Sequence, residues 1–284
     1  MDLVPFSFGR RARDEGKIKI EISNLYFTYP TGVNALRGIS LTIESGEQVA
    51  IVGQNGSGKT TLVKHLNGLL RPTSGVVQVG GWDTKSHSVA KLARRVGYVF
   101  QNPDEQLFSK NVGTEVAFGP RNMGLDSDQV QSLVKDALMM TELSDKTETN
   151  PYDLSATWRK MVALASVISM DTDIVIFDEP TTGQDAMNIA RIANVIKTLR
   201  TRGKTVITIT HDIDFCAENF ARVIALSQGK ILLDGKANEV LGQEEILAVT
   251  SVEPPQLTRL GKRLGFRNTV RIQDEFLTEL KRQV

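Results

Sequence analysis

Residues 53–60 are Gly-Gln-Asn-Gly-Ser-Gly-Lys-Thr, which fits the pattern G-x-x-x-x-G-K-[ST]. The apolar run 48–52 precedes this stretch and predicts a buried strand, while Leu62, Leu66 and Leu69 behind it recur at helical spacing. Glycines let backbone N–H groups converge on phosphate oxygens, and a following helix adds the positive end of its dipole. The order strand, glycine loop and helix therefore predicts a phosphate-binding loop in an α/β fold.

Two side chains at the end of this loop are suited to a nucleotide. Lys59 can supply a cation to the β- and γ-phosphates, and the Thr60 hydroxyl can ligate Mg²⁺. A glycine-rich turn could match the pattern by chance, but the flanking strand and helix argue against that alternative.

Carboxylates and a histidine follow two later apolar runs. Asp178 ends the run Val175–Phe177, where an aspartate of the P-loop class completes a Mg²⁺ shell, and the adjacent Glu179 can act as a general base. His211 follows the run 205–210, at the place where a partner for the γ-phosphate would be needed. An acidic pair at a strand end is usually a polar turn and a lone histidine is usually unremarkable. The upstream loop favours the functional interpretation of both.

Hydrophobic periodicity divides the sequence into three parts. They are an N-terminal extension at 1–17, a nucleotide-binding domain at 18–235 with a mostly helical subdomain at about 104–169, and a C-terminal extension at 236–284 with two short amphipathic helices. Strands are expected at 18–29, 36–43, 48–52, 173–177, 205–210, 223–226 and 231–233, the last two as a hairpin joined by Gln228-Gly229. Helices are expected at about 128–143, 155–169 and 185–201.

Composition excludes several classes of protein. Among 284 residues, 34 are basic and 33 acidic, so no strong bulk attraction to nucleic acid or anionic lipid is expected. No apolar stretch reaches the roughly 20 residues that cross a bilayer, and residues 1–17 lack the pattern of a secretory signal. The single cysteine, Cys216, excludes an internal disulfide and is expected to be a buried core thiol.

Six motifs occur in the order found in ATP-binding-cassette (ABC) ATPases, and the sequence resembles that family over about 18–235. The motifs are GQNGSGKTT at 53–61, Gln101 in VFQNPDEQ, Leu-Ser at 154–155, IFDEP at 176–180, TTGQD at 181–185 and Thr-His at 210–211. The segments VGYVFQNPDEQLF, VAFGPRNMGL and PPQLTRLGKRLG are similar to the ATPases of energy-coupling factor transporters, including the cobalt-transport type.

The resemblance implies a role for each matching residue. Glu179, His211 and Gln101 would be catalytic, and Thr60, Gln101 and Asp178 would hold Mg²⁺. Tyr29 would stack on adenine, although an ordinary half-buried strand aromatic remains an alternative for it. Ser155, Ala156, Thr157 and Asp185 would face the opposite subunit of a dimer. The nucleotide-binding residues would be Tyr29, Gly53, Asn55, Gly56, Ser57, Gly58, Lys59, Thr60 and Thr61.

The sequence departs from the family at the signature segment, which we define as residues 154–158. Leu-Ser-Ala-Thr-Trp stands where the family has LSGGQ, so Ala156 and Thr157 place Cβ atoms where glycines would admit the γ-phosphate closely. Trp158 replaces a smaller glutamine, and Met161 stands where arginine is usual. The departure is either tolerated drift or the mark of a dimer with two unequal ATP sites; we favour the second interpretation.

The resemblance implies an ATP-hydrolysing subunit that drives uptake of a vitamin or of cobalt or nickel ions, with ATP and Mg²⁺ as cofactors. The expected partners are a second, different ABC ATPase, an integral membrane coupling protein and a substrate-binding membrane protein, with no nucleic acid. The expected location is the cytoplasmic face of the membrane, as a peripheral subunit. The alternative is a soluble ABC-type ATPase that is not tied to transport and is either regulatory or associated with nucleic acid. ABC proteins that act on nucleic acid commonly have two cassettes or coiled-coil insertions, which this sequence lacks, and a regulatory module has only the altered signature in its favour.

Overall fold

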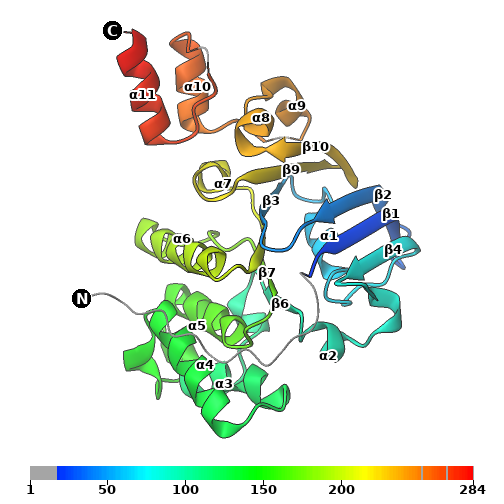
Figure 1. Cartoon of the computed structure of the whole chain (residues 1–284), viewed down its shortest axis with the longest axis vertical. Helices are drawn as coiled ribbons and strands as arrows, with labels where there is room; N and C mark the ends of the chain where they lie inside the picture. Colours follow the sequence, from blue (N-terminus) through cyan, green and yellow to red (C-terminus); the bar gives the residue numbers. More distant parts are fainter. Residues whose placement is uncertain (1–17, 251, 267, 284) are drawn as a thin grey trace.

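The computed structural model describes residues 18–250, 252–266 and 268–283. The N-terminal extension expected at 1–17 lies outside the described residues. Within them the fold is α/β, as the sequence predicts: two sheets pack with helices around them (Figure 1).

The larger sheet has six strands in the order β10-β9-β3-β8-β7-β6. The five strands from β9 to β6 are parallel, so their carboxyl ends meet at one edge of the sheet. The closing hairpin β9–β10 turns at Gln228-Gly229, where both residues have positive φ, as a two-residue hairpin turn requires. The strands are β3 (Gln48–Val52), β6 (Val96–Val99), β7 (Ile174–Asp178), β8 (Thr205–Ile209), β9 (Arg222–Ser227) and β10 (Lys230–Lys236).

The smaller sheet is antiparallel, with the order β2-β1-β4-β5. It consists of β1 (Ile20–Thr28), β2 (Asn34–Ile43), β4 (Ser74–Val79) and β5 (Trp82–Asp83). The strands β4, β5 and β6, with the short helix α2 (Val89–Leu92), were not expected from the sequence.

Alternation along the parallel strands separates two hydrophobic cores. In β7, Ile174 and Ile176 face the antiparallel sheet, while Val175 and Phe177 face a core shared with the helices. Both faces of the strand are buried, which explains why its sequence is continuously apolar. Figure 1 shows β1, β2 and β4 with α1 (Lys59–Lys64) on one side of the sheet and α5 (Ala156–Ile168) and α6 (Ala186–Thr201) on the other.

The helical part follows the sequence prediction closely. α3 (Val112–Asn122), α4 (Ser127–Met140) and α5 (Ala156–Ile168) pack on one another, and α6 (Ala186–Thr201) connects β7 to β8. No strand lies between 108 and 173.

The helix after the glycine loop is shorter than its leucine spacing predicts. α1 spans only Lys59–Lys64, and residues 65–70 form turns. The helix has His65 as its C-cap, so the buried Leu66 and the exposed Leu69 lie beyond it, and Gly68 adopts φ 74° within the turns that follow.

The last part of the chain joins the main core before it projects. α7 (Ile213–Asn219), α8 (Ala237–Leu241) and α9 (Glu244–Val249) precede the two expected amphipathic helices, α10 (Gln256–Arg263) and α11 (Gln273–Gln283). Leu241, Leu247 and Val252 belong to the core that the helices share with the sheet, whereas α10 and α11 form one end of the molecule (Figure 1). In the part of the chain that the structure describes, no helix is both long and apolar enough to cross a bilayer.

Candidate functional site

The carboxyl edge of the parallel sheet collects the residues that the sequence motifs single out. Gly53 follows β3, and Gln101 follows β6. Asp178 ends β7 and Glu179 comes directly after it, while His211 follows β8. β3, β8, β7 and β6 are neighbours in that order, so the topology brings four separate motifs to one side of the sheet.

The glycine loop, residues 53–60, packs closely against the carbonyl groups of neighbouring backbone at two positions where there is no room for a side chain. Gly53 has φ 148°, and a Cβ there would lie 2.1 Å from the Leu226 carbonyl oxygen. Gly58 has φ 105°, and a Cβ there would lie 2.7 Å from the Ala35 carbonyl oxygen. Both positions therefore require glycine.

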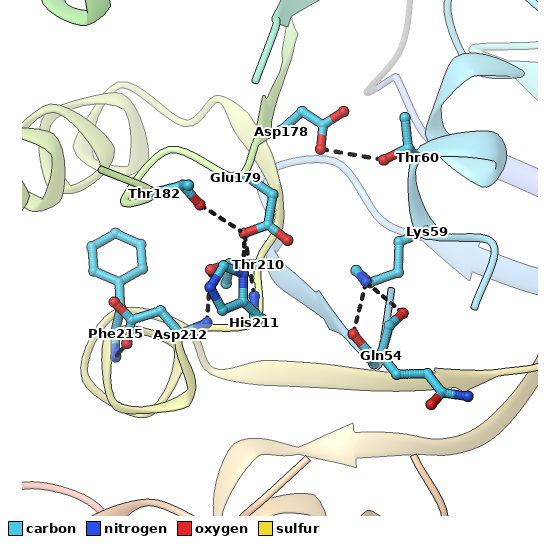
Figure 2. Close-up of polar contacts among 11 residues, drawn as sticks. Gln54, Lys59, Thr60, Asp178, Glu179, Thr182, Thr210, His211, Asp212 and Phe215 are labelled. Carbon is cyan, nitrogen blue, oxygen red and sulfur yellow. Dashed lines mark hydrogen bonds and ion pairs between the residues drawn. The ribbon is translucent and has the colours of Figure 1, made fainter. Parts of the chain in front are cut away.

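Lys59 lies across the loop that precedes it. Its Nζ donates to the carbonyl oxygens of Gly53 at 2.7 Å and Gln54 at 3.0 Å (Figure 2). Burial lowers the pKa of Lys59, while the charges of Glu179 and Asp178 act to raise it. The loop thus holds a partly desolvated cation that an anionic ligand could attract from these two carbonyls.

Asp178 is held between two hydroxyl groups. The Thr60 hydroxyl donates to Oδ1 at 3.4 Å, and the Tyr98 hydroxyl donates to Oδ2 at 2.6 Å. Tyr98 is 7% exposed, and burial with the neighbouring Asp178 charge raises its pKa, so it remains a neutral donor. The carboxylate is therefore oriented toward Thr60 (Figure 2).

Glu179 points away from Asp178 and toward His211. Its Oε2 accepts a hydrogen bond from the Thr182 hydroxyl at 3.4 Å and from the His211 backbone N–H at 3.3 Å, and it lies 2.8 Å from His211 Nδ1. The Glu179 carboxylate is buried, whereas the His211 ring is 62% exposed (Figure 2). The Glu179 carboxylate is therefore shielded from solvent, while the His211 imidazole beside it is accessible to solvent.

Tyr29 and Gln101, which the sequence analysis also assigned to this site, differ in their contacts and exposure. The Tyr29 hydroxyl lies 2.9 Å from the Thr61 hydroxyl, and its half-buried ring packs edge-on against Phe27. This position next to α1 agrees with either interpretation of Tyr29. Gln101 has an exposed side chain two residues after β6.

A cavity of about 520 Å³ joins the glycine loop to the last part of the chain. Gly53, Asn55 and His211 line it together with residues 252–256. The Gln54 backbone N–H donates to the Thr250 carbonyl at 3.1 Å, so the loop is also fastened to this segment.

The residues expected at a dimer interface lie on two helix ends. Ser155 is the N-cap of α5, and its hydroxyl accepts from the Trp158 N–H at 3.4 Å. Asp185 is the N-cap of α6 and accepts from the Asn188 N–H at 2.7 Å. Ala156 is exposed and Thr157 half-buried, and Figure 1 places α5 apart from α1, so the signature segment is not part of this chain's own glycine-loop site.

Trp158 does not project freely from the signature segment. Its half-buried ring packs against the core, with Lys146 Nζ 4.6 Å and Arg191 Cζ 4.8 Å from the ring centroid. Trp158, which stands where the family has glutamine, is therefore held by two cations: Lys146 from the helical part and Arg191 from α6.

The donor set fits a Mg²⁺–nucleotide ligand. The buried Ser57 hydroxyl has no hydrogen-bond partner among the described residues, which leaves it available to a phosphate oxygen. The oxygens of Thr60 and Asp178 are of the hard type that Mg²⁺ prefers. Tyr98 is a residue of this site to which the sequence analysis gave no role, although the quoted segment VGYVFQNPDEQLF contains it and it lies on a strand beside β7.

Comparison with known proteins gives consistent results. The family model described as "ABC transporter" matches residues 36–182. The energy-coupling factor transporter ATP-binding protein EcfA of Methanocaldococcus jannaschii is 35% identical over 268 residues, which cover 93% of this chain and 96% of that protein. EcfA of Methanothermobacter thermautotrophicus is 38% identical over 90% of this chain and 84% of its own length.

Two solved structures share the fold. CbiO1 of Clostridium perfringens, described as part of the ABC transporter complex CbiONQ, has a TM-score of 0.74 with 34% identity and covers 87% of this chain and 98% of its own. An ATP-binding cassette solved as a dimer after hydrolysis, with ADP and Pi, has a TM-score of 0.70 with 26% identity, over 77% and 98% of the two chains.

Relatives differ in length. The chain spans 45% of a relative from Caldanaerobacter subterraneus and 39% of one from Methanosarcina acetivorans, which are 40% and 42% identical to it. It spans nearly all of the Methanocaldococcus protein. On the extent of the family match and on these identities, the chain belongs to the ABC transporter family of ATP-binding proteins.

Proposed function

We propose that this chain hydrolyses ATP as one of two ABC ATPase subunits and thereby powers uptake through an energy-coupling factor type transporter. The observation that carries the proposal is the Glu179–His211 pair, 2.8 Å apart at the same sheet edge as the Thr60–Asp178 contact. The similarity to two EcfA proteins and to CbiO1 supports the transporter class.

In this proposal the glycine loop binds the phosphates of ATP. Backbone N–H groups, the Ser57 hydroxyl and the Lys59 ammonium would contact phosphate oxygens, with Lys59 released from the loop carbonyls that it now contacts. Thr60, Asp178 and Gln101 would hold Mg²⁺, which would offset the negative charge of the phosphates when bound. The remaining nucleotide contacts would come from Tyr29, Gly53, Asn55, Gly56, Gly58 and Thr61.

Glu179 would accept the proton of the attacking water. Its carboxylate is buried and already oriented by His211 and Thr182, as a general base requires. The exposed His211 ring would contact the γ-phosphate, and Gln101 would orient the water. The chain's contribution is positioning and charge stabilisation, which dominate catalysis of phosphoryl transfer.

The transporter setting supplies the proposed partners. A second ABC ATPase would close over this chain's glycine loop with its own signature, and would meet Asp185 and this chain's signature segment in return. A membrane coupling protein would respond near Gln101, and a substrate-binding membrane protein would select a vitamin, cobalt or nickel ion. The chain would then lie peripherally on the cytoplasmic face of the membrane.

Glu179→Gln tests the proposed activity. The amide cannot accept the proton of water, so we expect steady-state ATP hydrolysis by the assembled transporter to fall by about 10²–10⁴-fold, while nucleotide affinity is retained. Glu245→Gln, which removes the same charge from an exposed position, is the control and should leave turnover unchanged. Normal turnover in Glu179→Gln would refute the assignment, and a lack of turnover in the unmodified complex would favour a regulatory nucleotide-binding protein.

A further inference from the structure

Lys160 is a buried cation that none of the sequence motifs includes. It lies in the second turn of α5, five residues after Ser155, and its side chain is 1% exposed. Its Nζ donates to the carbonyl oxygens of Phe100 at 3.1 Å and Gln101 at 2.6 Å. Burying an ammonium group costs free energy, because the group loses its hydration. A lysine is therefore expected at such a position only where its hydrogen bonds offset that cost and serve the structure or the function.

The charge of Lys160 is not paired directly with a carboxylate among the described residues. Burial lowers the pKa of Lys160 to about 8, although the charges of Asp178 and Glu179 act in the opposite direction. The two carbonyl groups are therefore the direct partners of this cation.

Two further side chains connect the same parts of the fold. We define the Gln101 loop as residues 100–106. Gln106 accepts from the Phe100 N–H at 3.1 Å and donates to the Ala163 carbonyl of α5 at 2.8 Å. Arg159 of α5 pairs with Asp104 at 2.9 Å. The Gln101 loop is thus joined to α5 through three side chains, and among the described residues Lys160 is the one that holds the backbone carbonyl of Gln101 itself.

We propose that Lys160 is a positioning residue that fastens the backbone of the Gln101 loop to α5. Because the signature segment forms the N-terminal end of α5, the loop and the signature would then move as one body. The lysine contacts carbonyl groups and not the Gln101 amide, so the amide stays free to face the reacting groups. This inference rests on the role of Gln101 in the proposed function.

The first test measures the loop directly and needs no hydrolysis. Lys160→Met keeps the length of the aliphatic chain and removes the donors. We expect backbone hydrogen exchange in residues 100–106 to accelerate at least tenfold, with no change in residues 48–52 of β3. Lys135→Met, the same substitution at an exposed position of α4, is the matched control and should change neither segment. Unchanged exchange in residues 100–106 of Lys160→Met would overturn the proposal.

The second test uses the kinetics of the assembled complex. We expect Lys160→Met to lower kcat for ATP about tenfold and to leave KM within about twofold, since Lys160 does not touch the glycine loop. Lys160→Gln, which keeps an N–H donor, should lose less. In a Gln101→Ala background, Lys160→Met should cause no further loss, because it acts through Gln101. Multiplying losses would mean a general structural role and would contradict the proposal.

The two tests also separate this proposal from the proposed function. If Gln101→Ala alone leaves turnover unchanged, the role assigned to Gln101 fails, and the exchange measurement still decides whether Lys160 holds the loop. If Lys160→Met does not fold, Lys160→Gln is used in both measurements. It can satisfy at most part of the two contacts, so intermediate acceleration of exchange is expected, and exchange as slow as in the unmodified chain would count against the proposal.

Discussion

The backbone of Glu179 adopts φ 48°, in the left-handed region that residues with side chains rarely occupy. Such a conformation costs about 1–3 kcal/mol and persists only where neighbouring contacts enforce it. Here the Glu179 N–H donates to the Ile209 carbonyl at 2.8 Å, which continues the pairing of β7 with β8. The unusual conformation turns the carboxylate from the direction of Asp178 toward His211, and so lets two adjacent carboxylates face different groups.

Tyr98→Phe tests how strongly the orientation of Asp178 matters to stability. The substitution removes a buried 2.6 Å hydrogen bond to a carboxylate and leaves one carboxylate oxygen without that donor. Hydrogen bonds to charged groups are worth about 1.5–3 kcal/mol, so we expect the free energy of unfolding to fall by that amount. Urea denaturation of the purified chain measures it.

Tyr152→Phe is the matched control for this experiment. The Tyr152 hydroxyl also donates at 2.6 Å, but to the Leu107 backbone carbonyl, and the residue is 51% exposed. Water can replace this bond, so the expected loss is about 0.5–1 kcal/mol. Equal losses in the free energy of unfolding would show that the hydrogen bond from Tyr98 to Asp178 stabilises the fold no more than an exposed bond to a backbone carbonyl.

For single residues, the sequence was sufficient to predict that Asp178, Glu179 and His211 lie close together, because they follow apolar runs that form neighbouring parallel strands. Tyr98 and Lys160 could not be found in that way. Tyr98 lies on a four-residue strand that is too short for a clear pattern, and Lys160 is a residue type that is usually solvated although it lies on the buried face of α5. Their partners, Asp178 and Gln101, are 80 and 59 residues away along the chain, so only the tertiary fold identifies them.

Among the elements, α5 is connected to its neighbours on two sides through the signature segment. Trp158 contacts Lys146, which ends the short helix η3 (Ser144–Lys146), and Arg191 of α6. Arg191 also pairs with Glu142 at 2.8 Å. A residue that departs from the family pattern therefore joins the helical part to the core.

Trp158→Gln should destabilise the fold even though it restores the residue usual in the family. It removes a half-buried ring and both cation–π contacts, for which we expect a loss of about 2 kcal/mol in the free energy of unfolding. Urea denaturation checks this, with Thr157→Ser as a neighbouring control that keeps a side chain of similar polarity. An unchanged unfolding midpoint in Trp158→Gln would mean that the ring contributes little to packing.

The elements that the sequence predicted well have strong local signals. The hairpin β9–β10 has Gln-Gly between two apolar runs, and α4 has a helical stripe with a capping box at Asp126. α1 was predicted too long because leucine spacing continues to Leu69, whereas the helix ends at Lys64 and the chain then forms turns that include Gly68 at positive φ. β4 was missed because it is short and half-exposed and pairs with β1, about 50 residues away, and β5 was missed because this edge strand has only two residues and pairs with β4.

For the whole molecule, the proposed dimer would contain two unequal ATP sites. One site would combine this chain's glycine loop, Asp178, Glu179 and His211 with the partner's signature. The other would combine the partner's catalytic residues with this chain's signature segment, where Ala156 and Thr157 occupy the first turn of α5. In this proposal their Cβ atoms would stand where glycines would admit the γ-phosphate, so the second site is expected to bind ATP and hydrolyse it slowly.

This asymmetry predicts unequal effects of equivalent substitutions. Glu179→Gln in this chain should abolish most ATPase activity and transport of the assembled complex, and the same substitution at the partner's equivalent glutamate should cost much less. The measurement is the ATPase activity of the reconstituted complex with each glutamate changed separately. Equal losses, or a larger loss from the partner, would contradict asymmetry and return the altered signature to tolerated drift. A chain that forms only homodimers should instead show low ATPase activity, since both sites then contain the altered segment.

Repairing the signature gives an independent measurement at the same scale. Because Trp158 packs into the core, the repair is best limited to Ala156→Gly and Thr157→Gly, which leave the ring and its two cations in place. Glycines in the first turn of α5 cost about 1 kcal/mol each in helix stability, so a parallel denaturation measurement is needed. In a complex whose first site is blocked by Glu179→Gln, the repaired segment should raise the residual ATPase activity, since the partner's catalytic residues then face a signature that admits the γ-phosphate. If the repaired complex folds and its residual activity does not rise, the two Cβ atoms are not what slows the second site.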